Sequence, residues 1–201
     1  MRSFAPRFST PLDAPRPRGA RLLEGFSPKL SRRIRLFDRA TFDQWIRLEG
    51  DPTVLCFCER PLRLSPTPGA RLVDFWVQRD DGEQLLLVND DEDEPLSPTA
   101  SDIPLRRVAA AELAAAAMWI VNWQRIADHR FHASLAKQTD ASIHQYVHDP
   151  VSLSGLEQAF ATGDPPVVRG AVFELLRRGR LSAPSLYSQP LTPQTIFGPT
   201  P

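Results

Sequence analysis

Alternating apolar and polar positions dominate the middle of the chain and predict β-strands there. Strands are predicted at residues 54–58, 62–64, 71–78 and 84–88. The third is rich in β-branched and aromatic residues, and Asp81-Gly82 is a strong hairpin signal between the third and the fourth. The pattern therefore predicts a meander of antiparallel strands.

A period of three to four residues between apolar positions predicts helices on both sides of this meander. Helices are predicted at residues 31–48, 105–117, 152–160 and 167–178, with a broken helix at 128–146. Residues 118–126 are interpreted as one more strand, which the preceding helix would connect to the hairpin by a right-handed crossover. These elements predict an α/β fold, a restriction-endonuclease-like mixed sheet flanked by helices.

The C-terminal part predicts a small second unit. Its first helix begins at Ser152 or at Ser154, the latter giving a capping box with Glu157. Gly179 ends the next helix, and a short strand begins at residues 180–181. Helix, turn, helix, glycine and strand is typical of a winged-helix module, and a simple helical hairpin is the alternative.

Charge and proline are distributed unevenly, although the 201 residues carry no net charge at pH 7. The first 30 residues combine prolines with arginines and predict an extended basic arm, which is either a disordered tail or a strap that orders on a partner or on phosphates. The predicted organisation is an arm (1–30), an α/β domain (31–148), a helical or winged-helix unit (149–183) and an extended tail (184–201). No apolar run reaches membrane length and no signal segment is evident, so no membrane partner and a location in the cytoplasm are expected.

The only two cysteines, Cys56 and Cys58, lie two positions apart on a predicted strand. Their side chains would share one face of that strand and pack as small apolar groups. No second pair of cysteine or histidine residues at zinc-binding spacing accompanies them.

Polar residues converge on the predicted hairpin. Asp74 lies in its first strand, and Asn89 and Asp91 follow its second strand. Because the start of one antiparallel strand lies beside the end of its neighbour, these side chains are expected to meet. Carboxylate and amide oxygens suit Mg²⁺, with Asp74 and Asp91 as the expected metal ligands.

The order Asp-Phe-x-Val, turn, Leu-Leu-Leu-Val and polar residues resembles the nuclease core of the PD-(D/E)xK superfamily. More narrowly, it resembles the N-terminal domain of TnsA-like endonucleases, the subunits of heteromeric transposases that cut the 5′ ends of a transposon. Residues 51–64, an Asp-Pro, a Val-containing strand, a proline and a second strand, are similar to the same family. The resemblance covers roughly residues 35–125.

Departures from the family pattern affect its catalytic positions. Val73 stands where the family carries proline, and Asn89-Asp90-Asp91 replaces Glu-x-Lys or Gln-x-Lys, so the lysine that would activate water has become an acid. The acid that the family carries on its first helix has no clear counterpart, although Asp38 or Thr41 lies near that position. The resemblance therefore implies a nuclease scaffold whose cutting chemistry is impaired.

Three functions remain open on the sequence alone. The first is a catalytically impaired TnsA-like subunit that binds DNA, a transposase partner or both, without a cofactor. The second is an active Mg²⁺-dependent endonuclease in which Asp74, Asp91 and Asp38 hold the metal with Asn89, and the third is an adaptor protein of a mobile element or phage. The cations expected to contact DNA phosphates are Arg32, Arg33, Arg106, Arg107, Arg177 and Arg178.

Overall fold

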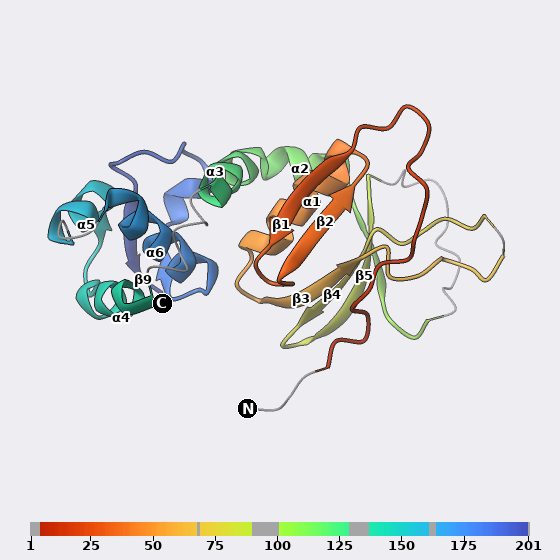
Figure 1. Cartoon of the computed structure of the whole chain (residues 1–201), viewed down its shortest axis with the longest axis horizontal. Helices are drawn as coiled ribbons and strands as arrows, with labels where there is room; N and C mark the ends of the chain where they lie inside the picture. The colour runs from red at the N-terminus through yellow and green to blue at the C-terminus, as the bar shows by residue number, and fades with distance from the viewer. Residues whose placement is uncertain (1–4, 68, 90–100, 129–136, 161–163, 201) are drawn as a thin grey trace. The chain divides into compact units, whose positions relative to one another are not determined.

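A computed structural model describes residues 5–67, 69–89, 101–128, 137–160 and 164–200 (Figure 1). The chain forms two compact units, which are described separately. The first comprises Met1–Glu49 and Thr53–Ala115, and the second comprises Gly50–Pro52 and Ala116–Pro201. The domain boundary expected at residue 148 thus lies inside the second unit.

The first unit is an α/β structure. Its elements are β1 (Leu23–Ser27), β2 (Arg32–Leu36), α1 (Arg39–Gly50), β3 (Val54–Glu59), β4 (Phe75–Arg79), β5 (Gly82–Val88), β6 (Leu105–Val108) and α2 (Ala110–Ala115). Strands β3 to β6 form one sheet in chain order; the first two pairs are antiparallel, and β5 and β6 are parallel. The prediction of an α/β fold with a mixed sheet flanked by helices is confirmed.

The predicted hairpin is the centre of this sheet. Arg79 pairs with Gly82 across a two-residue turn, and Phe75 pairs with Leu86. Gly82 has a φ of 148°, which favours glycine. The strand expected at 62–64 is reduced to one isolated bridge between Arg63 and Leu72. Asp74 lies just before β4 rather than inside it.

One face of the sheet carries an apolar cluster that includes both cysteines. Cys58, Val73, Trp76, Leu85 and Ile103 are buried there, and Cys56 packs against them. The prediction that the two cysteines pack as apolar groups is confirmed. Burial raises the pKa of the Cys58 thiol to about 11.

The helix predicted at 31–48 is wrong in its first third. Residues 32–36 form β2, which pairs with β1 as an antiparallel two-stranded ribbon (Figure 1). Ile34 and Leu36 are buried while Arg33 and Arg35 are exposed, which is the period of two expected of a strand with one covered face. The apolar positions further along follow the helical period, and α1 begins only at Arg39.

The described part of the predicted basic arm, residues 5–30, contacts the rest of the first unit. Its residues 23–27 form β1, and the Phe8 ring packs edge-to-face on Trp76 with centroids 5.6 Å apart. Arg7 is paired with Glu83 and Asp102, and the Leu12 N–H donates to the Arg60 carbonyl.

Two predicted elements change type where the two units join along the chain. Residues 105–108, expected as the first turn of a helix, form β6 beside β5, and α2 follows. Residues 118–126, expected as a strand, belong to α3 (Ala117–Asp128). The buried positions Trp119, Trp123 and Ile126 recur every three to four residues, as on one face of a helix. This helical period outweighs the strand preference of the local sequence Trp-Ile-Val.

The second unit combines helices with three short strands. After α3 come α4 (Lys137–Tyr146), β7 (Val151–Ser152), α5 (Leu153–Ala159), α6 (Pro165–Arg177), β8 (Leu181–Ser182), the 3-10 helix η2 (Pro184–Tyr187) and β9 (Ile196–Pro199). The last strand lies between the other two, antiparallel to both. Helices and a small antiparallel sheet together form this unit, and the choice between a winged-helix module and a helical hairpin stays a prediction.

The tail predicted as extended is an integral part of this unit. Phe197 on β9 is fully buried, and its ring lies 6.3 Å from that of Phe173 on α6. Asn122 of α3 is fully buried and donates to the carbonyls of Leu186 and Gln189, while its own carbonyl accepts from the Leu191 N–H. These hydrogen bonds fix the segment that joins η2 to β9, which a composition of Ser, Thr and Pro did not predict.

Helix α5 begins as one of the two predicted alternatives. The Ser152 side chain accepts from the Gly155 N–H, which makes Ser152 the N-cap. The alternative capping box between Ser154 and Glu157 is wrong, because Glu157 is paired with Arg169 of α6.

Candidate functional site

Asp74 lies directly before β4 and beside the end of β5, as predicted from the hairpin. Its backbone N–H donates to the Leu86 carbonyl, and its Oδ2 accepts from the Val88 N–H at 2.7 Å. The Arg71 guanidinium lies 3.8 Å from the same oxygen. The carboxylate therefore fastens the end of β5 to the start of β4.

Asn89 follows directly on β5. Its φ of 51° is in the left-handed region, which asparagine tolerates better than most residues, and its N–H donates to the Val108 carbonyl of β6. The side chain is exposed. Asp91, the third predicted site residue, lies outside the described residues. Asp74 therefore contacts Val88, the residue before Asn89, and the predicted convergence of three side chains stays a prediction.

A magnesium ion requires a particular arrangement of oxygen ligands. Mg²⁺ takes six oxygens in near-ideal octahedral geometry. One oxygen of Asp74 already serves the Val88 N–H and lies near a guanidinium. Within the described part of the chain, no three His, Cys, Asp or Glu side chains are grouped as metal ligands would be.

Asp38, the doubtful first-helix acid, has a structural position. Its two carboxylate oxygens accept from the N–H and the hydroxyl of Thr41 at 2.8 and 2.7 Å. Since α1 begins one residue later, Asp38 is the N-cap of that helix. Its carboxylate is therefore already used in starting the helix.

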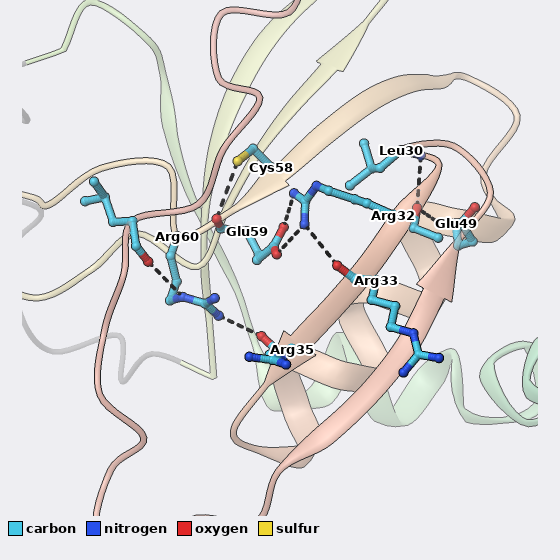
Figure 2. A network of polar contacts seen from close by, with 10 residues as sticks. Leu30, Arg32, Arg33, Arg35, Glu49, Cys58, Glu59 and Arg60 are labelled. Atoms are coloured by element: carbon cyan, nitrogen blue, oxygen red, sulfur yellow. Dashed lines mark hydrogen bonds and ion pairs between the residues drawn. The ribbon is translucent and has the colours of Figure 1, made fainter.

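Arg32 is paired inside the first unit. Its guanidinium donates to both oxygens of Glu59 at 2.6 and 2.5 Å, and Glu59 is only 1% exposed at the end of β3 (Figure 2). The hydrogen bond to Glu59 raises the pKa of Arg32. A bidentate pair with a buried carboxylate joins β2 to the large sheet, so Arg32 has a structural role, and its predicted contact with DNA stays a prediction.

Arg60, next to Glu59, also connects β2 to the end of β3. Its guanidinium donates to the carbonyls of Arg35 and Leu12, and it lies 5.4 Å from the centre of the Phe37 ring. The Arg33 side chain, in contrast, points away from this network, and only its carbonyl contributes to it (Figure 2). Arg33 is exposed, as a DNA contact must be.

The next predicted pair lies on β6. Arg106 is ion-paired with Glu112 of α2, and its side chain is 42% exposed. Arg107 is half-buried and has interactions of its own. The structure therefore engages both cations locally.

The predicted pair on α6 is neutralised by acids. Arg177 donates to both oxygens of Glu174, and Arg178 donates to the same carboxylate at 2.7 Å and lies 3.8 Å from Asp140 of α4. Burial of Glu174 favours its neutral form, but the two arginines together lower its pKa below the ordinary value. Burial raises the pKa of Asp140.

Two buried carboxylates escaped the sequence analysis although they fix the geometry of the ribbon. Glu59 holds Arg32, and Glu49 accepts from the Ser27 hydroxyl and the Lys29 N–H. Lys29 in turn donates to the Leu48 carbonyl at the end of α1. For Glu59, the only signal in the sequence is its position directly after the apolar residues of β3. Glu49 has no comparable signal.

No model of a known protein family matches the chain, and no curated protein is significantly similar to it. Among the described residues, no helix is both long and apolar enough to cross a membrane.

Proposed function

We propose that the protein is a catalytically impaired, TnsA-like subunit that binds DNA within a transposition or other DNA-processing complex. It contributes assembly rather than strand cleavage, in contact with DNA and a transposase or related partner. The proposal rests on the resemblance of residues 35–125 together with the arrangement of the first unit.

The observation that carries the proposal is the use of Asp74. An acid at the start of one strand beside the end of its neighbour is the arrangement that the resemblance implies for the metal-binding acid. Here that carboxylate accepts from the Val88 N–H and lies near Arg71, so it stabilises the pairing of the end of β5 with the start of β4. The family's lysine position carries Asp91, whose charge has the wrong sign to activate an attacking water.

The second unit supports a role in DNA processing through its element order. Helix–turn–helix modules are widespread in DNA-binding proteins, where the second helix enters the major groove. In this chain the second helix is α6, and its arginines 169, 177 and 178 are all ion-paired. These arginines therefore act first within the unit, and contact with phosphates would require them to exchange their acidic partners.

The test combines binding and cleavage on one duplex. Fluorescence anisotropy of a labelled 30-bp duplex, titrated with the protein from 20 to 200 mM salt, measures binding; incubation with Mg²⁺ or Mn²⁺ and plasmid DNA measures cleavage. We expect binding whose affinity falls linearly with salt on a logarithmic plot, and intact plasmid.

Asp74→Asn is the matched variant, because asparagine keeps an oxygen that can accept from the Val88 N–H but removes the charge that a metal needs. We expect its DNA affinity to equal that of the wild type. Metal-dependent cleavage by the wild type that Asp74→Asn abolishes would establish an active nuclease instead. Absence of DNA binding at 20 mM salt would leave an adaptor role.

A further inference from the structure

The ribbon of β1 and β2 presents one face to solvent. Cross-strand partners in an antiparallel pair point to the same side, and Phe26 pairs with Arg33 while Glu24 pairs with Arg35. All four are exposed, Phe26 to 54%. We call these four residues, which alternate with covered positions, the ribbon face.

The opposite side of the ribbon is held firmly. Gly25 lies so close to the Trp45 ring that an added Cβ would come within 2.2 Å of it. The buried pairs of Ser27 with Glu49 and of Arg32 with Glu59 fix the two strands from below. A strand pair fixed in this way presents its outer side chains without the loss of entropy that ordering a free hairpin would require.

Charge makes the ribbon face different from the other arginine-bearing surfaces. Glu24 is the only acid of the ribbon face. It forms an ion pair with Arg35 at 2.8 Å, and the Arg35 side chain is 71% exposed. Such an exposed pair contributes little and exchanges readily for a phosphate. The chain that leads into β1 adds three exposed arginines, at positions 16, 18 and 21, and no ion pair of theirs occurs within the described residues.

We propose that the ribbon face is the surface on which this protein binds duplex DNA. The inference rests on the proposed function and names its contact. Arg33 and Arg35 bind phosphates, and Phe26 packs against the sugars or base edges between them. A two-stranded ribbon fits the major groove of B-form DNA, and the excess of exposed arginines complements its phosphates.

The test compares two double variants that remove equal charge. Arg33→Ala/Arg35→Ala alters the ribbon face, and Arg125→Ala/Arg180→Ala removes two exposed arginines of the second unit. Anisotropy of a random-sequence duplex is followed from 20 to 200 mM salt. We expect the first variant to reduce the slope of log affinity against log salt by about two, and the second to leave the slope of the wild type unchanged.

Phe26→Ala separates an apolar contact from a change of charge. It is expected to weaken duplex binding at every salt concentration without changing the slope, because no phosphate contact is lost. A single-stranded oligonucleotide of the same sequence is expected to bind less tightly than the duplex.

Three results would overturn the inference while leaving the proposed function intact: an unchanged slope in the ribbon variant, a reduced slope only in the second-unit variant, or tighter binding of the single strand. Loss of all binding by the wild type would instead contradict the proposed function itself. Circular dichroism of each variant confirms that the fold is kept before its slope is interpreted.

Discussion

Arginine side chains have different roles in the two units. In the first unit, Arg32 of β2 forms a bidentate pair with Glu59. The other two arginines of β2, Arg33 and Arg35, are exposed on the ribbon face. In the second, the arginines of α6 are held by acids of their own helix and its neighbours. A cluster of arginines in a sequence is therefore a candidate for DNA contact only where the fold leaves their charge without a buried partner.

Removing Arg32 should have the largest effect on this comparison. Arg32→Ala leaves the Glu59 carboxylate buried without its partner, and we expect the free energy of unfolding to fall by about 3 kcal/mol. Arg33→Ala, one position along, is exposed and should change it by less than about 0.5 kcal/mol. Urea unfolding at pH 7 measures both. Equal effects would remove the distinction between a structural and a surface arginine within β2.

The contact of the ribbon with α1 gives the next effect. Gly25→Ala places a methyl group against the buried Trp45 ring, and we expect a loss of about 2 kcal/mol as ring and ribbon shift apart. Phe26→Ala, on the exposed side of the same strand, is the control. Thermal unfolding followed by tryptophan fluorescence measures both. If Gly25→Ala were neutral, the ribbon would not be fixed as its proposed role in DNA binding requires.

The smallest effect concerns the pH dependence of the second unit. The arginines lower the folded-state pKa of Glu174 below the ordinary value of 4.5, so the ionised carboxylate stabilises the fold above that value and this contribution is lost as the pH falls through the lowered pKa. Glu174→Gln keeps the hydrogen-bond geometry without the charge and should cost about 1 kcal/mol at pH 7.

The difference between Glu174→Gln and the wild type should shrink when urea unfolding is repeated at pH 3, because Glu174 of the unfolded chain is then protonated and unfolding is favoured by this proton uptake. A difference that stays constant from pH 7 to pH 3 would mean that the ion pairs of α6 contribute nothing, and that its arginines are available to ligands.

The sequence predicted best those elements whose signals are local. The β4–β5 hairpin follows from its turn and its β-rich strands, and α6 from an apolar stripe ended by Gly179, whose φ of 64° suits glycine. Local signals predicted the wrong element type where contacts with distant residues determine the structure. Residues 118–126 have strand-like composition but form a helix whose Asn122 binds a segment more than 60 residues away.

The candidate site shows the same limit. The position of Asp74 beside the end of β5 follows from the hairpin and could be predicted. The pairing of Arg32 with Glu59, 27 residues later, depends on how β2 packs on β3, and the pairing of Arg178 with Asp140 depends on α4 packing against α6. No pattern within either segment reveals these partners, so the predicted set of DNA-binding arginines mixed structural and exposed ones.

The most direct test of the account measures DNA binding and stability together in two double variants, Arg33→Ala/Arg35→Ala and Arg177→Ala/Arg178→Ala. The account predicts that the first reduces the salt slope of duplex binding by about two and keeps the urea midpoint, while the second lowers the urea midpoint and keeps the slope. The reverse pattern, a reduced slope in the α6 variant and a lowered midpoint in the ribbon variant, would contradict it.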